Sequence, residues 1–161
     1  MTVVSNTGPL VALAKLDQLS LMERLFSKVF IPPVVHRELL AKIGPESARL
    51  DNALLEFIQI VQVPSLAPEV EVVTMRLDPG EQQAVALAYE RKALLVIDDR
   101  LGRAAARRLA LNVTGLVGVL IRAKEAGLVP KVCPLLDQVR QQGYWLSDET
   151  LNVAAKLAGE A

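Results

Sequence analysis

The sequence has few aromatic residues, a single cysteine and a single histidine. Phenylalanine, tyrosine and tryptophan make up 4% of its 161 residues, so a platform that stacks a run of nucleobases is not expected. A lone cysteine, Cys133, excludes a disulfide within the chain. A lone histidine, His36, excludes a zinc site that needs several histidines of one chain.

Long apolar runs and net charge are also missing. No segment approaches the roughly 20 apolar residues of a membrane-spanning helix, and no basic region followed by a long apolar one marks a signal peptide. Together with the single cysteine, this favours the reducing cytoplasm. Lys+Arg and Asp+Glu both number 18, so any binding to nucleic acid must come from a local basic patch.

What the chain does contain is aliphatic residues in alternating patterns. A hydrophobic content of 52% excludes intrinsic disorder, and the length predicts a single domain over residues 1–161. Strand-like runs are residues 2–5, 29–31, 57–63, 93–97 and 112–114. Helical patterns are residues 9–16, 17–26, 34–42, 45–56, 79–92, 100–109, 115–126, 133–142 and 147–157. This alternation predicts an α/β fold with a mostly parallel sheet covered on both faces.

Polar residues follow several of the predicted strands. Asn6 follows the first, Asp98 and Asp99 follow residues 93–97, and Thr114 ends the last. Because parallel sheets place ligand sites at the carboxyl ends of their strands, these groups are expected to converge on one cleft. Carboxylates without histidine or cysteine suit Mg²⁺ or Mn²⁺, which activate water against phosphodiesters.

Two more carboxylates, Glu38 and Glu81, lie in predicted helices, and each candidate also has a structural interpretation. Glu81 closes a near capping box that starts at Asp78. Asp99 and Asn6 suit helix caps or turns, and Glu38 suits a solvated helix face. Asp98 is different, because a carboxylate at the end of an apolar strand is costly unless it is paired or liganded.

A basic stripe follows the two aspartates. Arg100, Arg103 and Arg107 share one face of the helix predicted over residues 100–109. They fit contacts to a phosphate backbone, which need no overall positive charge. The alternative is a solvated helix face.

Five segments, in this order and spacing, carry a family resemblance. They are residues 4–10 (VSNTGPL), 31–39 (IPPVVHREL), 78–88 (DPGEQQAVALA), 94–103 (LLVIDDRLGR) and 113–120 (VTGLVGVL). They resemble the PIN-domain family of metal-dependent ribonucleases. The closer resemblance is to a PIN-like branch of predicted nucleic-acid-binding proteins that serve as toxins in toxin–antitoxin pairs.

The resemblance implies an α/β/α sandwich with a central parallel sheet. It also implies an acidic cluster that binds Mg²⁺ or Mn²⁺ and cleaves single-stranded RNA, and a small antitoxin as partner. Glu38 matches the second acidic position, Glu81 the third, and Asp98, beside Asp99, the position after the fourth strand. Thr7 matches the small hydroxyl residue that follows the first acidic position.

The departure from the family pattern is Asn6, where most active relatives carry aspartate. Three hypotheses therefore stand at the level of sequence. The leading one is a Mg²⁺- or Mn²⁺-dependent ribonuclease with Glu38, Glu81 and Asp98 as catalytic residues. The second is a PIN-fold protein that binds RNA or a protein without cleaving, and the third is a receiver-like phosphoacceptor domain, disfavoured because no carboxylate follows the first strand.

The last predicted helix is a candidate interface. It carries few charges, and its apolar residues are Leu151, Ala154, Ala155 and Leu157. The excess of apolar residues over the needs of a core predicts a homodimer or a bound antitoxin segment on this helix.

Overall fold

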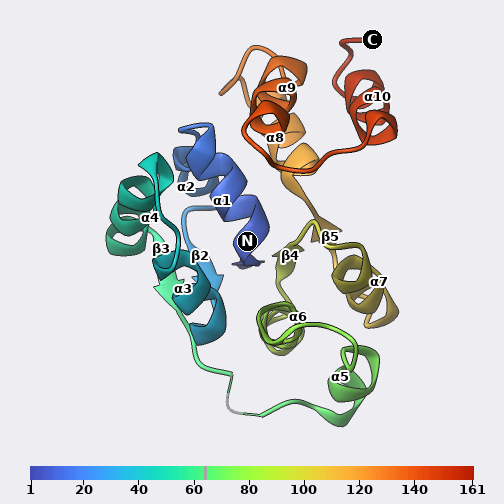
Figure 1. Cartoon of the computed structure of the whole chain (residues 1–161). Coiled ribbons are helices and arrows are strands. Elements are labelled where there is room, and N and C mark those ends of the chain that lie inside the picture. Colours follow the sequence, from blue (N-terminus) through green and yellow to red (C-terminus); the bar gives the residue numbers. More distant parts are fainter. Residues whose placement is uncertain (64) are drawn as a thin grey trace.

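The computed structural model describes residues 1–63 and 65–161. Within these residues, five parallel strands form one sheet in the order β3-β2-β1-β4-β5, with helices on both sides (Figure 1). The strands are β1 (Val3–Ser5), β2 (Val29–Ile31), β3 (Ile58–Ile60), β4 (Leu94–Val96) and β5 (Val113–Thr114). The α/β fold with a parallel sheet is thus confirmed, although β3 is shorter than the strand expected over residues 57–63.

The helices occupy the predicted segments with one addition. They are α1 (Thr7–Lys15), α2 (Ser20–Phe26), α3 (Pro33–Leu40), α4 (Pro45–Glu56), α5 (Pro68–Val73), α6 (Pro79–Arg91), α7 (Arg100–Arg108), α8 (Leu116–Glu125), α9 (Cys133–Gln141) and α10 (Asp148–Leu157). Helix α5 was not predicted, because its valines are typical of strands. A proline at its start and acidic residues in its first turn favour the helix.

Alternating residues of the central strands supply two separate cores. Val3 of β1 packs with the core on one face, whereas its neighbour Val4 packs with the core on the other. The first core is built with α1, α2, α4 and α8, and the second with α6 and α7 (Figure 1). Strands buried on both faces explain why residues 93–97 form one continuous apolar run.

The strand order reverses between β1 and β4. From β1 the chain runs to β2 and β3 on one side, then returns to place β4 and β5 on the other. Such a switch point opens a crevice at the carboxyl ends of the strands. The order also rules out the receiver-like alternative, since receiver domains place their strands in a different order, 2-1-3-4-5.

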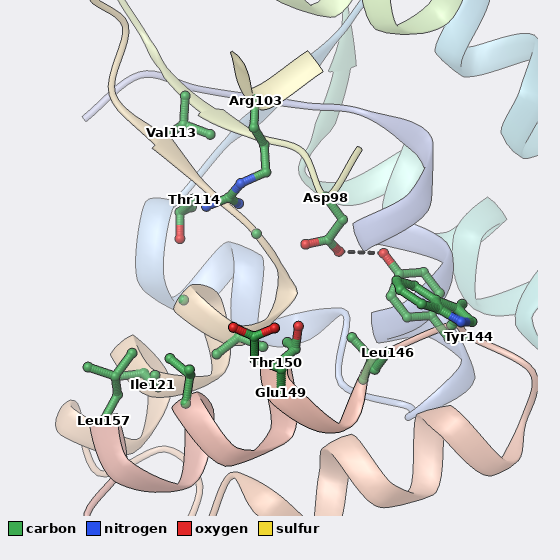
Figure 2. Close-up of a pocket in the computed structure, with 15 residues that line it drawn as sticks. Asp98, Arg103, Val113, Thr114, Ile121, Tyr144, Leu146, Glu149, Thr150 and Leu157 are labelled. Carbon is green, nitrogen blue, oxygen red and sulfur yellow. Dashed lines mark hydrogen bonds between the residues drawn. The ribbon is translucent and has the colours of Figure 1, made fainter. Parts of the chain in front are cut away.

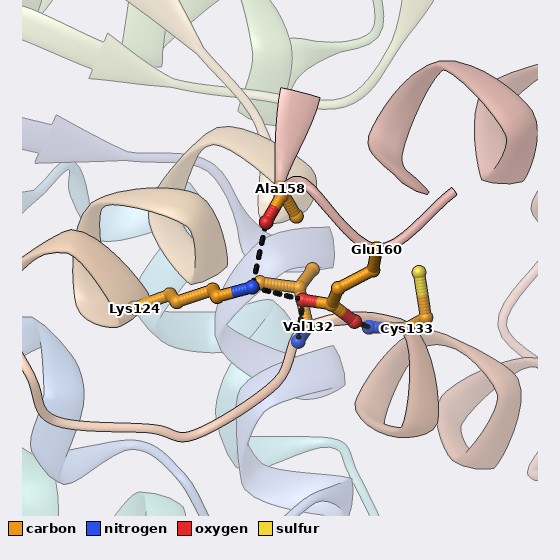
Figure 3. Close-up of polar contacts among 5 residues, drawn as sticks. All are labelled: Lys124, Val132, Cys133, Ala158 and Glu160. Carbon is orange, nitrogen blue, oxygen red and sulfur yellow. Dashed lines mark hydrogen bonds and ion pairs between the residues drawn. The ribbon is translucent and has the colours of Figure 1, made fainter. Parts of the chain in front are cut away.

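The C-terminal helices pack together beside α1 and α2, and a carboxylate near the chain end fixes them. Glu160 accepts hydrogen bonds from the backbone N–H groups of Val132 (2.8 Å) and Cys133 (2.9 Å), at the start of α9. It also pairs with Lys124 Nζ of α8 at 2.9 Å (Figure 3). These contacts lower the pKa of Glu160 to about 2, the backbone bonds being the largest cause.

None of the helices in the described part of the chain combines the length and the apolar character needed to cross a membrane.

Candidate active site

The crevice at the switch point begins at Asn6. Ser5 pairs with Val96 across β1 and β4, and the backbone N–H of Asn6 donates to the Val96 carbonyl at 2.9 Å. Asn6 stands at the N-cap position of α1, yet its side chain makes no capping bond. The side-chain amide at this position is therefore not committed to the helix, contrary to the capping interpretation.

Thr7, the next residue, is buried. Its hydroxyl oxygen has no partner at hydrogen-bonding geometry among the described residues. It lies close enough to Glu38 to oppose the rise in that residue's pKa. The Thr7 hydroxyl is thus placed beside Glu38, and its role in nucleic-acid binding stays a prediction.

Glu38 rests against the first turn of α6. A Cβ atom placed on Gly80 would lie 2.0 Å from Glu38 Oε1, so a larger residue at position 80 would displace this carboxylate. The pKa of Glu38 is raised, first by burial and then by the charge of Asp78. Glu38 is therefore not a solvated residue on a free helix face.

Glu81 combines the capping role with a place in the crevice. Its backbone N–H donates to Asp78 Oδ1 at 2.8 Å, and its side chain accepts a long bond of 3.4 Å from the Asp78 N–H. Burial, followed by the charges of Asp99 and Asp78, raises the pKa of Glu81 to about 7. Glu81 is thus a capping residue that also lies beside the carboxylate of Asp99, at the start of α7.

Asp99 caps α7, because its Oδ2 accepts the Gly102 N–H at 2.7 Å. The same carboxylate acts on Glu81. Asp78 acts on both Glu38 and Glu81, and Asp99 acts on Glu81, so we call these four carboxylates the acidic cluster: Glu38, Asp78, Glu81 and Asp99. From the sequence, Asp78 was predicted only to cap the following helix and was not named as a site residue. The one feature that pointed to a role in the site was its place at the start of the Asp-Pro-Gly-Glu segment.

Asp98 makes its hydrogen bonds outside this cluster. Its Oδ1 accepts the Leu116 N–H at the start of α8 at 3.0 Å, and its Oδ2 accepts a hydrogen bond from the Tyr144 hydroxyl (Figure 2). Burial, and then the charge of Asp98, raises the pKa of Tyr144. The carboxylate is paired, as its position after an apolar strand requires, but the partners come from the chain itself.

The predicted arginines separate into two groups. Arg103 is half-buried beside Asp98 and donates from Nη1 to the Ile97 carbonyl at 3.1 Å. Burial is the main cause that lowers its pKa, and the charge of Arg107 adds to it. Arg100 and Arg107 are exposed on α7. Thr114 is buried at the end of β5, close to Arg103 (Figure 2).

The donor set is suited to a hard divalent cation. Every acidic donor is a carboxylate oxygen. After burial, the charge of a neighbouring aspartate raises the pKa of Glu38 and of Glu81, a repulsion that a bound cation relieves. Within the described residues, however, no three His, Cys, Asp or Glu side chains already form a group that could hold a metal ion. The chemistry of the cluster fits a hard divalent cation.

The fold and the crevice define an α/β protein with an acidic site at the switch point of a parallel sheet. The model of the family DUF3368, a PIN domain, matches residues 2–160. The chain therefore belongs to the PIN-domain family. Members of this family have a nuclease-type fold and generally use divalent metals, and membership implies binding to nucleic acid. A comparison with the curated proteins found no match.

Proposed function

We propose that the chain is a divalent-metal-dependent endoribonuclease that cuts single-stranded RNA. The observation that carries the proposal is the acidic cluster, in which Glu38 and Glu81 are held with raised pKa values beside two further carboxylates. Carboxylates that destabilise one another are retained where their charge serves chemistry. A PIN fold around them favours phosphodiester hydrolysis over other reactions of a carboxylate site.

Mg²⁺ or Mn²⁺ would be held by Glu38, Glu81 and the adjacent Asp98 and Asp99, with the Asn6 amide oxygen at the edge. When bound, the ion supplies an activated water and neutralises the charge that develops on the phosphate. Two of the proposed catalytic residues come from helices: Glu38 from α3 and Glu81 from α6. Asp98, the third, becomes available to the ion if Tyr144 releases its Oδ2.

The arginines and threonines around the crevice are the proposed contacts to RNA. Arg100 and Arg107 are free to meet phosphates from the exposed face of α7, while Arg103 reaches the crevice from within. Thr7 and Thr114 offer hydroxyls at the ends of β1 and β5. Contacts of this kind position the strand and are independent of its sequence.

The test is cleavage of a labelled single-stranded RNA by the purified chain. We expect cleavage with Mn²⁺ or Mg²⁺ and none with EDTA. Glu38→Gln and Glu81→Gln should lower the rate by at least about a hundredfold, the usual size of a lost acid–base or ligand group. Glu125→Gln, an exposed glutamate at the end of α8, removes the same charge away from the crevice and should leave the rate unchanged.

A second candidate function is binding of RNA or a protein without cleavage. Two observations favour it: Asn6 provides no charge, and both oxygens of Asp98 are bonded within the chain. In that case RNA binds with similar affinity in EDTA and in Mn²⁺, and no product forms under either condition.

The cellular role that we propose is that of a toxin restrained by a small antitoxin, acting in the cytoplasm. Expression of the chain alone should arrest growth, and Glu81→Gln should abolish the arrest. A homodimer is proposed through Leu151 and Ala155 of α10, which are partly exposed. Ala154 cannot contribute to it, because it is fully buried within the chain.

A further inference from the structure

A groove runs from the end of β4 to the last helix. It has a volume of about 510 Å³ and lies between the β5–α8 segment and α10, with Asp98 and Arg103 at one end (Figure 2). We call it the C-terminal groove. Its volume lies within the range of small-ligand pockets, and the function proposed above uses only Asp98, Arg103 and Thr114 of its lining.

The walls of the C-terminal groove are apolar and include the only tryptophan of the sequence. Ile121 of α8 and Val153 and Leu157 of α10 line it, and so does Trp145. Trp145 is 82% exposed and Val153 is 49% exposed. Exposed aromatic rings beside a nucleic-acid site bind bases by stacking, whatever the base. The scarcity of aromatic residues argues against a platform for many bases, but one indole suffices for a single base.

The floor of the groove carries hydrogen-bonding groups that make it more than an apolar surface. Glu149 and Thr150, in the first turn of α10, point toward the space beneath Arg103 and Thr114 (Figure 2). The Thr150 hydroxyl already pairs with Ser147 Oγ at 2.8 Å. The exposed Glu149 carboxylate offers two acceptor oxygens and no donor.

A carboxylate of this kind distinguishes among the bases. Guanine presents two adjacent donors on its Watson–Crick edge, N1–H and N2–H, which match the two oxygens of one carboxylate. The other bases present at most one such donor beside an acceptor, which a carboxylate repels. In single-stranded RNA this edge is free to be read.

The position of the groove favours a nucleotide over a protein segment. Arg103 lines the groove together with Trp145 and Glu149, so its guanidinium is available to the phosphate of a nucleotide bound there. Asp98, the neighbour of Asp99 in the acidic cluster, lines the same end. A chain of RNA that leaves the groove at this end therefore reaches the end of β4, where Asp99 of the acidic cluster follows Asp98.

We propose that the C-terminal groove is a subsite for one guanine base of single-stranded RNA, stacked on Trp145 and read by Glu149. The proposal rests on the proposed function for the nature of the substrate. Beyond that function, the proposal says that the site selects one base. It therefore predicts that the chain prefers RNA with guanine at one fixed position relative to the cut.

The single tryptophan makes the subsite measurable without cleavage. Emission of Trp145 in the full chain is followed during titration with GMP, AMP, CMP and UMP in EDTA, with correction for absorption by the nucleotide. GMP should quench the emission and bind with an affinity about tenfold above that of the other three nucleotides. A difference in affinity of about tenfold is what one bidentate hydrogen-bonded contact contributes. Glu149→Gln should remove this preference, because its amide presents one donor and one acceptor, and should leave the quenching by AMP.

Glu125→Gln is the matched control, an exposed glutamate of α8 outside the groove, and should keep the GMP preference. The proposal is overturned if the four nucleotides quench alike, if none quenches, or if Glu149→Gln retains the preference. It is also overturned if Trp145 emission changes with protein concentration alone and GMP has no effect, since a second copy of the chain then covers the groove.

Failure of the subsite and failure of the proposed function give different results. A chain that prefers GMP but cuts no RNA supports the guanine subsite and contradicts the nuclease. A chain that cuts RNA at every base alike supports the nuclease and contradicts the subsite.

Discussion

The Tyr144 hydroxyl donates a hydrogen bond to Asp98 Oδ2 across 46 residues of sequence. The other oxygen of Asp98 accepts the Leu116 N–H. One carboxylate therefore connects the end of β4, the start of α8 and the segment before α10. In a PIN domain, an acidic residue expected in the metal site thus also holds the C-terminal part of the fold in place.

Tyr144→Phe should destabilise the fold, because it leaves a partly buried carboxylate oxygen without its donor. We expect the free energy of unfolding to fall by about 1.5 kcal/mol, as for hydrogen bonds to charged groups, measured by urea denaturation. The matched control is Tyr89→Phe, whose hydroxyl donates to Glu69 at 2.7 Å on the exposed surface, and it should change stability by less than about 0.5 kcal/mol. Equal losses for the two variants would contradict a structural role for Tyr144.

The sheet and most helices were predictable from sequence because each element carries a local signal. Residues 93–97 form an unbroken apolar run, and Gly127 and Gly143, which have positive φ angles, directly follow predicted helices. Helix α5 was missed because its valines oppose the helical signal of its proline and glutamates. Local patterns predict such elements only where propensity and tertiary contacts agree.

The site was predictable in part. Asn6 and Glu81 were identified because they follow a strand or open a helix at a spacing typical of the family. Tyr144 was not, since its contact with Asp98 depends on how the C-terminal helices return to the sheet. The local sequence likewise does not show which way Asp98 and Asp99 point, which is decided by the partners of each carboxylate.

Glu81→Gln should stabilise the metal-free protein at high pH. The pKa of Glu81 is about 7 in the fold and 4.5 ordinarily, so the folded state keeps a proton that the unfolded state loses between these values. Stability therefore falls as pH rises through this window, and glutamine, which cannot ionise and still suits the capping box, avoids the loss. We expect a melting temperature roughly 2 °C above wild type at about pH 8, with the difference vanishing toward pH 4.5.

Gly80→Ala should move the Glu38 side chain without much change in the stability of the fold. The added Cβ would meet Glu38 Oε1 at 2.0 Å, and the mobile end of that side chain can move aside. We expect unfolding free energy within about 1 kcal/mol of wild type, together with loss of the Mn²⁺-dependent rise in melting temperature. Glu38→Gln should lose the same response, and the double variant should lose no more. A Gly80→Ala protein with the full response to Mn²⁺ would show that the ion does not depend on the present position of Glu38, and a Glu38→Gln protein with the full response would show that Glu38 does not bind it.

Glu160→Gln should weaken the C-terminal anchor in a pH-dependent way. The pKa of Glu160 is lowered to about 2, so its ionised form stabilises the fold above the ordinary value of 4.5. This contribution is lost as pH falls from 4.5 toward 2. The melting temperature of Glu160→Gln should lie below that of wild type near neutral pH and approach it in acid. Glu125→Gln should follow the wild-type curve, and a constant difference at every pH would exclude the ionic contribution.

Asn6→Asp decides between the nuclease and the binding protein. Asn6 lies at the switch point with a side chain that does not cap α1, so aspartate adds a charge where an ion would be held. In a working site, the charge lowers metal-free stability by about 1 kcal/mol but increases the affinity for Mn²⁺ and the rate of RNA cleavage, because carboxylates bind hard cations better than amides do. Asn52→Asp, at an exposed position of α4, controls for the added charge and should change neither. If the fold serves binding alone, the added charge meets only other carboxylates. Asn6→Asp would then be destabilised, its melting temperature would not respond to Mn²⁺, and it would cut no RNA.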